Sequence, residues 1–220
     1  MPYSVIIPIY NELTHITVLL NEIKSLLLNN HHEIIIVDDG STDGTTDILK
    51  NCQFINFLAL SKNYGKGIAV REGLKIASHD KIIIFDGDLE IHPQNILKLM
   101  ILNKNKGINC VFGSRYVWIN PFNSFWDFGN YILTKFFNSI HKTYLIDSLC
   151  CAKAFYKKYL QTENLKSEGF DIDIEISKML LNNIDNINTV FLDYNRRSKK
   201  EGKKLNLIDG WAIVKRTLQN

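Results

Sequence analysis

Two acidic residues flank a glycine at the end of a strongly apolar segment. The stretch KIIIFDGDLEIHP (81–93) places Asp86 and Asp88 directly after the residues IIIF. Acidic side chains are poor strand formers and are costly to bury, so this position calls for a chemical reason. A hard divalent cation, held by one or two carboxylates and completed by substrate phosphate oxygens, would supply one. Gly87 would let a diphosphate approach the backbone closely, although an ordinary surface turn also favours Asp and Gly.

Two familiar loops that bind calcium or phosphate do not fit this segment. In an EF-hand starting at Asp86, Ile91 would stand where glycine is required and Leu97 where glutamate is required. A Walker A loop is absent, because GxxxxGK followed by Ser or Thr does not occur in the chain. What remains is a Mg²⁺ or Mn²⁺ site for which Asp86 and Asp88 provide carboxylates and a diphosphate provides the other oxygens.

Polar residues also follow the other strands that the sequence predicts. Short runs rich in Ile and Val predict strands at 3–9, 33–39, 55–60, 81–85 and 108–113. The polar residues after the first four of these strands are Asn11 and Glu12, Asp38 and Asp39, Lys62 and Asn63, and Asp86 and Asp88. Because ligands in open α/β sheets bind at the carboxyl ends of the strands, these side chains predict one shared site.

Helical patterns alternate with these strands and must hold them in place. The helices expected from apolar periodicity lie at 16–27, 66–77, 94–103 and 207–218, and a last strand lies at 188–194. The alternation predicts an α/β fold with a mostly parallel sheet and right-handed crossovers. Beyond residue 115 the rhythm weakens, and the aromatic-rich segment 116–140 fits either core packing or an interfacial helix.

The composition is that of a globular protein with a local basic excess. The 220 residues are 45% hydrophobic and 22% charged, with a net charge of +3. The segment RRSKKEGKK (196–204) holds six basic residues and one acidic residue, a net +5, which leaves −2 for the rest of the chain. This excess predicts an anionic ligand or a membrane surface near the C-terminus and argues against a general nucleic-acid binder.

Cysteine usage and hydropathy suggest where the protein works. The four cysteines form no CxxC pair, so they predict buried thiols in a reducing compartment rather than disulfides or a zinc site. The N-terminus enters a predicted strand within four residues, so no signal peptide is expected. No apolar run approaches the ~20 residues of a membrane-spanning helix. We therefore expect a cytoplasmic protein, soluble or peripheral at the membrane face.

Several motifs occur together in one order. They are VIIPIYNE (5–12), EIIIVDDGSTDGT (33–45), SKNYGKGIAVREGL (61–74) and FDGDLEIHP (85–93). In this order the chain resembles the inverting glycosyltransferases of family 2, which have the GT-A fold. The later segments GSRY (113–116), IDSLCCAKAF (146–155), EGFDIDIEIS (168–177) and YNRRSKKEGKKLNLIDG (194–210) resemble the dolichyl- and polyprenyl-phosphate sugar transferase branch. The resemblance implies one domain over 1–220, with a nucleotide-sugar-binding half (1–90) and an acceptor-binding half (91–220).

The resemblance assigns donor-site roles in the first half. It implies that the base and ribose of a GDP- or UDP-sugar are bound by Pro8, Tyr10, Glu12 and Asp39, and that Asp86 and Asp88 hold Mn²⁺ or Mg²⁺. Carboxylates suit the first task because they accept hydrogen bonds from ribose hydroxyls and from a base N–H. Asp38 and Asp39 also fit a capped turn into the next helix. Lys66 fits a contact to the diphosphate or a solvated lysine that starts a helix.

Acceptor-site roles follow from the same resemblance. Asp147 is implied as a candidate general base, and a cap or an ion pair with Lys153 is its alternative. Residues implied for the acceptor or its phosphate are Arg115, Glu175, Arg196, Arg197, Lys203 and Lys204, with Glu175 expected to orient a basic residue. The branch often has Asn-Pro-Arg where this chain has Asn195-Arg196-Arg197, which makes Arg197 the better match. Ala152 likewise stands where an aromatic residue is frequent.

The reaction implied is inverting, metal-dependent sugar transfer, with a polyprenyl phosphate as the preferred acceptor and the cell envelope as its context. A phosphate monoester has a second pKa near ~6, so a lipid phosphate is already an oxyanion at neutral pH and hardly needs a base. The main alternative acceptor is a sugar hydroxyl of a surface polysaccharide, which does need one. On this reasoning Asp147→Asn separates the two acceptors. A nucleotidyltransferase and a non-catalytic sugar-nucleotide-binding module are the lesser alternatives, and a lipid acceptor implies peripheral membrane docking or a membrane-protein partner.

Overall fold

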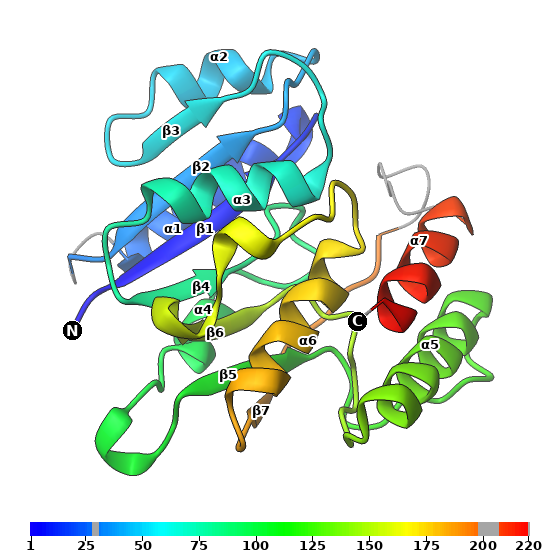
Figure 1. Ribbon diagram of the computed structural model, residues 1–220. Helices are drawn as coiled ribbons and strands as arrows, with labels where there is room; N and C mark the ends of the chain where they lie inside the picture. Colours follow the sequence, from blue (N-terminus) through cyan, green and yellow to red (C-terminus); the bar gives the residue numbers. More distant parts are fainter. Residues whose placement is uncertain (28–30, 198–206, 220) are drawn as a thin grey trace.

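The computed structural model describes residues 1–27, 31–197 and 207–219. Their strands form one seven-stranded sheet in the order β3-β2-β1-β4-β6-β5-β7 (Figure 1). The strands are β1 (Tyr3–Ile9), β2 (Glu33–Asp38), β3 (Asn56–Ala59), β4 (Lys81–Ile84), β5 (Cys110–Ser114), β6 (Lys153–Tyr156) and β7 (Asn188–Phe191). All pairs are parallel except those of β6, which runs antiparallel to both β4 and β5. The α/β class and the mostly parallel sheet predicted from the sequence are confirmed.

Helices cover both faces of this sheet. They are α1 (Leu13–Leu27), α2 (Thr45–Lys50), α3 (Lys66–Ile76), α4 (Asn95–Leu99), α5 (Phe125–His141), α6 (Ile172–Asn183) and α7 (Leu207–Leu218). Successive residues of β1 pack into different cores: Ile7 joins α1 on one face, whereas Ile6 joins α3 and α6 on the other. Burial on both faces explains why the strands are almost continuously apolar. A third, smaller cluster joins α5, α6 and α7, which lie together at one end of the molecule (Figure 1).

The observed elements differ from the predicted ones in several places, including the helices α2 and α6, which are absent from the predicted set. The strand β6 was not predicted, because four residues are too few for a periodic signal and Lys153 interrupts their apolar character. The helix expected at 94–103 is much shorter, since α4 ends at Leu99. Through β6, the first ninety residues and the remainder of the chain share one continuous sheet, so residues far apart in sequence meet at its edge.

Candidate active site

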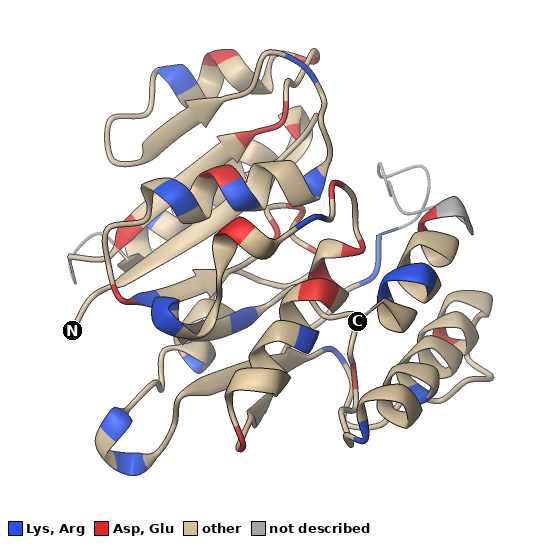
Figure 2. Ribbon diagram, viewed as in Figure 1, with Lys and Arg blue, Asp and Glu red and all other residues tan. Residues whose placement is uncertain are grey.

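A cavity of about 590 Å³ lies at the carboxyl ends of β1, β2 and β4. The first half of the chain contributes Pro8, Tyr10, Glu12, Asp39, Asn63, Lys66, Asp86 and Asp88 to its lining. The second half contributes, among others, Arg115, Trp126, Asn130, Phe170, Asp173, Tyr194, Arg196, Arg197 and Asp209. The polar residues that follow the first four strands thus do meet at one place. Figure 2 shows acidic and basic segments close together where α3, the start of α6 and the segment after β7 converge.

Lys66 lines the cavity and lies between two carboxylates. Its Nζ is 2.9 Å from Asp86 and 2.8 Å from Oδ2 of Asp173, which lies in the first turn of α6. Burial alone would lower the pKa of Lys66, but the charges of Asp173 and Asp86 raise it well above the ordinary value. Lys66 is therefore a fixed cation rather than a solvated lysine. It stands where a diphosphate beside Asp86 would reach it.

The environment of Asp86 and Asp88 fits a divalent cation. Burial, followed by the negative charges of Asp86 and Glu90, raises the pKa of Asp88 to about 7. Oδ1 of Asp86 is buried and makes no hydrogen bond of acceptable geometry, although Lys66 Nζ is close. Two interacting buried carboxylates, one with an oxygen that accepts no hydrogen bond, are what a hard cation neutralises. Among the described residues no group of three or more such ligands forms, so the remaining ligands would be diphosphate oxygens and water.

Gly87 has a structural explanation that differs from the predicted one. A Cβ at this position would lie 2.3 Å from Cδ1 of Ile9 and 3.0 Å from Cγ2 of Ile7. The missing side chain therefore makes room for the core beneath the loop. Core packing thus requires glycine here, and because Gly87 also lines the cavity, the predicted close approach of a diphosphate stays a prediction.

The adjacent residues Asp38 and Asp39 have different roles. Asp38 accepts hydrogen bonds from Ser41 and Thr46 and so stabilises the turn that leads into α2. Asp39 lines the cavity, and its two oxygens accept from the backbone N–H groups of Tyr64 and Gly65 at 2.8 Å. Burial raises the pKa of Asp39 despite these bonds. Asp38 thus stabilises the turn without capping α2, whose N-cap is Gly44, and Asp39 remains the candidate for the nucleotide.

Arg197 connects the C-terminal part of the chain to the donor residues. Its Nη1 lies 2.8 Å from Oε2 of Glu12 and donates to the carbonyl of Asp88 at 2.7 Å. Its backbone N–H donates to the side chain of Glu90 at 3.0 Å. Arg197 therefore lies against the predicted metal and ribose residues. The sequence did not predict the ion pair between Arg197 and Glu12.

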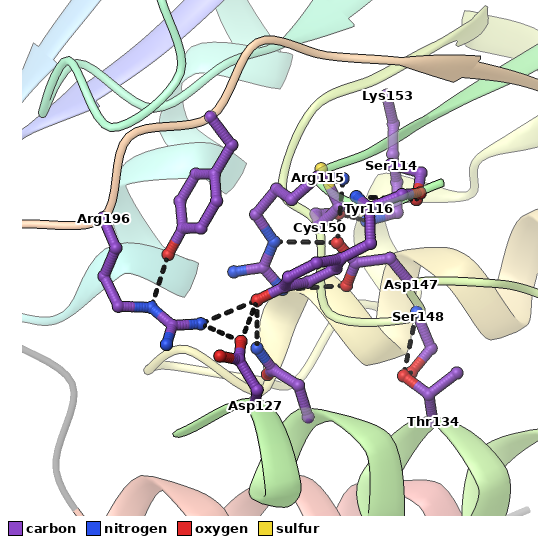
Figure 3. Close-up of polar contacts among 12 residues, drawn as sticks. Ser114, Arg115, Tyr116, Asp127, Thr134, Asp147, Ser148, Cys150, Lys153 and Arg196 are labelled. Atoms are coloured by element: carbon purple, nitrogen blue, oxygen red, sulfur yellow. Dashed lines mark hydrogen bonds and ion pairs between the residues drawn. The ribbon is translucent and has the colours of Figure 1, made fainter. Parts of the chain in front are cut away.

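Asp147 forms a buried pair with Arg115, as Figure 3 shows. Its Oδ2 accepts from Nε of Arg115 at 2.8 Å and from the Arg115 backbone N–H at 3.1 Å, and its Oδ1 accepts from Nη2 at 2.8 Å. The Asp147 side chain is 0% exposed and does not line the cavity. Burial would raise its pKa, but Arg115 lowers it below the ordinary value. A sequestered, weakly basic carboxylate is a poor general base, so the predicted role of Asp147 is corrected: it positions Arg115.

The predicted ion pair of Asp147 with Lys153 does not form, although the charge of Lys153 helps to lower the pKa of Asp147. Lys153 is buried within β6, and its Nζ donates to the carbonyl of Cys150 rather than to Asp147 (Figure 3). Arg115 itself reaches the cavity, with its guanidinium 5.7 Å from the ring centre of Tyr116 and 5.5 Å from that of Tyr194. Two aromatic rings and one carboxylate thus hold this cation at the cavity wall.

Arg196 stabilises the N-terminal end of α5. Its guanidinium donates to Tyr194, Ser124, Tyr116 and Asp127, at distances from 3.0 to 2.5 Å. Figure 3 shows the contacts with Tyr116 and Asp127. Ser124 in turn caps α5 by accepting from the backbone N–H of Asp127. Arg196 lines the cavity, but each of its nitrogens already donates to a protein oxygen. Of the two adjacent arginines, Arg196 therefore serves structure on the acceptor side and Arg197 faces the donor side.

Glu175 lies outside the cavity, which corrects its predicted place in the acceptor site. It accepts from the backbone N–H groups of Lys166 and Ser167 and lies 3.1 Å from Nη1 of Arg216. Arg216 also donates to Asp171 at 3.0 Å, so both acids tie α7 to α6. Glu175 does orient a basic residue, but that residue is a helix anchor. Lys203 and Lys204 lie outside the described residues.

Sequence reasoning missed several residues of the cavity wall. They are Trp126, Asn130, Phe170 and Asp173. The signal available for Asp173 is its spacing, because on a helix it lies on another face than Asp171 and Glu175, which are four positions apart. The others lie in segments that carry no strand-end pattern.

The fold resembles that of solved glycosyltransferases. Glucosyl-3-phosphoglycerate synthase from Mycobacterium tuberculosis, in complex with Mn²⁺, UDP and glucosyl-3-phosphoglycerate, matches with a TM-score of 0.72. The match is 20% identical in sequence and covers 99% of this chain and 78% of that chain. The fold is therefore the GT-A fold of nucleotide-diphospho-sugar transferases, as the motifs predict.

The chain belongs to glycosyl transferase family 2, whose model matches residues 4–163. Dolichol-phosphate mannosyltransferase of Pyrococcus furiosus is 37% identical over 120 residues, which are 53% of this chain and 34% of that protein. Undecaprenyl-phosphate 4-deoxy-4-formamido-L-arabinose transferase of Aeromonas hydrophila is 33% identical over 104 residues, 44% of this chain and 32% of that protein. The chain thus spans about a third of the length of these curated relatives. These names agree with the branch that the later motifs predict.

Proposed function

We propose that this chain transfers a sugar, of the mannose or glucose type, from a GDP- or UDP-sugar to a polyprenyl phosphate, with inversion. One observation carries the proposal: Asp86, Asp88 and Arg115 line a single cavity. The two carboxylates suit a cation-bound diphosphate, and the guanidinium suits an anionic acceptor. The named relatives, which act on dolichyl and undecaprenyl phosphates, support this choice of acceptor.

On the donor side, Pro8, Tyr10, Glu12 and Asp39 surround the proposed place of the base and ribose. Asp86 and Asp88 would hold Mn²⁺ or Mg²⁺, which neutralises the charge that develops on the departing diphosphate. Lys66 adds a fixed positive charge beside them. For Arg197 to contact the diphosphate, it would exchange its bond with Glu12 for one with phosphate.

On the acceptor side, the buried pair of Arg115 and Asp147 favours a phosphate over a hydroxyl. Asp147 uses Nε and Nη2 of Arg115, whereas Nη1 makes no hydrogen bond with the described residues. Arg115 is thus oriented by Asp147 and keeps donor capacity towards the cavity. A lipid phosphate arrives ionised and needs no base, while a hydroxyl acceptor would need a base that Asp147 does not supply.

Exposed aromatic residues near α5 support peripheral docking at a membrane. Trp118, Phe122, Phe125 and Phe128 are 69%, 90%, 68% and 50% exposed, and Trp211 on the neighbouring α7 is 75% exposed. Aromatic side chains of this kind favour the membrane interface. In the part of the chain that the structure describes, no helix has both the length and the apolarity to span a bilayer. We propose that this surface brings the cavity to a lipid acceptor at the cytoplasmic face.

The test supplies Mn²⁺ and labelled UDP-glucose or GDP-mannose to the full chain with three acceptors: a short polyprenyl phosphate, the matching polyprenol and an oligosaccharide. We expect transfer to the phosphate alone, and none by Asp86→Asn. Transfer to the oligosaccharide instead would establish the hydroxyl alternative. A wild-type protein whose thermal stability responds to no nucleotide sugar, with or without Mn²⁺, would refute the function altogether.

A further inference from the structure

Asp173 is a cavity residue that the reaction outlined above leaves without a task. It lies in the first turn of α6 and is 6% exposed. Its Oδ2 is 2.8 Å from Nζ of Lys66, and Lys66 reaches Asp86 on its other side. Lys66 thus bridges Asp173, from the second half of the chain, and the predicted metal ligand Asp86.

The second oxygen of Asp173 has no partner within the described part of the chain. Oδ2 takes the bond from Lys66, whereas Oδ1 accepts no hydrogen bond from any described residue. Oδ1 is also not among the fully buried, unsatisfied oxygens, so it is open to the cavity that Asp173 lines. The nearby Asp171 differs, because it pairs with Arg216 and lies outside the cavity.

A purely structural role explains only part of this arrangement. An acidic residue in the first turn of a helix is favoured by the helix dipole, and an ion pair with Lys66 holds the side chain still. Neither effect requires a carboxylate oxygen that opens into a cavity. Desolvating such an oxygen is costly unless something donates a hydrogen bond to it.

The position of Asp173 indicates which group would donate a hydrogen bond to its Oδ1. In the proposed reaction, the diphosphate lies beside Asp86 and Lys66, and the acceptor lies towards Arg115. The transferred sugar would lie between them, in the cavity that Asp173 also lines. We propose that Oδ1 of Asp173 accepts a hydrogen bond from a hydroxyl of the transferred sugar and so helps to select the donor sugar. This inference rests on the proposed function and deepens it.

The expected effect is a difference between donors. A site built around a hydrogen bond to a hydroxyl rejects an analogue that lacks it, because a buried polar group is then left unpaired. A charged acceptor makes the loss about tenfold or more in affinity. The bare nucleoside diphosphate has no sugar, so its affinity should depend little on Asp173.

The experiment is a calorimetric titration of the full chain with Mn²⁺ and the probes UDP, GDP, UDP-glucose and GDP-mannose. Monodeoxy analogues of whichever nucleotide sugar binds are then titrated. The variants are Asp173→Ala and the isosteric Asp173→Asn, which keeps the volume beside Lys66 if the alanine variant fails to fold. Asp171→Asn is the matched control, since it breaks a similar ion pair at the start of the same helix outside the cavity.

The inference expects Asp173→Ala to lower nucleotide-sugar affinity about tenfold or more and nucleoside-diphosphate affinity less than about threefold. The wild type should reject one deoxy analogue, and the variant should not. An equal loss for both kinds of ligand would mean that Asp173 acts only through Lys66 and would overturn the inference. Normal binding with lost turnover would overturn it too. A wild type that binds none of the probes would instead bring down the proposed function and this inference together.

Discussion

Replacing Asp147 by asparagine distinguishes a positioning residue from a general base. In the folded protein Asp147 accepts three hydrogen bonds from Arg115, and its side chain is 0% exposed while that of Arg115 is 15% exposed. An asparagine keeps the volume but removes the charge and turns an amide N–H towards a guanidinium N–H. The variant therefore leaves a buried cation without its counter-charge.

The size of the effect follows from this burial. Removing one partner of a buried ion pair costs about 3–5 kcal/mol. For a chain of this length, each 1 kcal/mol lowers the melting temperature by roughly 2–4 °C, so Asp147→Asn should lower it by roughly 6–20 °C. The pH dependence has a definite sign. Arg115 holds the folded-state pKa of Asp147 below its unfolded value of ~4, so its stabilisation is present above that pH and is lost as the pH falls through the folded-state pKa. The variant should lack this contribution to acid denaturation.

The assay is denaturant and thermal unfolding of three variants beside the wild type. Asp193→Asn is the matched control, because Asp193 pairs with Lys98 at the same 2.8 Å but its side chain is 79% exposed. That substitution should leave the melting temperature unchanged, since water screens the pair. A double variant with Asp147→Leu and Arg115→Met should recover stability, because both charges are gone, but should not recover transfer.

A different outcome would refute the positioning role. If Asp147→Asn unfolds at the wild-type temperature, and its transfer rate loses the dependence on an ionising base, then Asp147 is the base after all. On the present geometry the substitution impairs any reaction that uses Arg115. It therefore does not separate a phosphate acceptor from a hydroxyl acceptor, which corrects the expectation drawn from the sequence.

Four further outcomes are expected. Burial and neighbouring acids raise the pKa of Asp88 to about 7, so Mn²⁺ must displace a proton below that pH. The affinity for Mn²⁺, measured by titration, should rise up to about tenfold per pH unit from pH 5 to 7 and then level off. An affinity that does not change with pH would contradict the assignment of Asp88 as a metal ligand. Since this pKa lies above the ordinary value, Asp88 should make the metal-free protein less stable as the pH rises from about 4 to about 7. Gly87→Ala should cost about 1–3 kcal/mol of unfolding free energy by overpacking, whereas a loss of UDP affinity at unchanged stability would favour the diphosphate explanation. Arg216→Ala should cost about 3 kcal/mol by denaturation, because it leaves the buried Asp171 and Glu175 without their cation; unchanged stability with a raised acceptor KM would instead place Arg216 in the acceptor site.

The donor side could be predicted from the sequence because its information is local. Each of Glu12, Asp39 and Asp86 follows directly after a buried strand, and parallel strands bring their carboxyl ends to one edge. The acceptor side was predicted less well. Asp147 and Glu175 carry the motif, but whether a carboxylate faces a cavity or a buried arginine depends on contacts that no local pattern records.

The sequence alone determined the fold class, the family and the edge of the sheet where the site lies, because strand periodicity and the residues after each strand are read within a few positions of one another. Only the tertiary structure decided which charges are available there. Arg115 pairs with Asp147 across 32 positions, Lys66 with Asp173 across 107, and Glu12 with Arg197 across 185. Folding sets these partners. In a low-dielectric interior, the partner determines whether a charged group only stabilises the fold or can also bind a ligand.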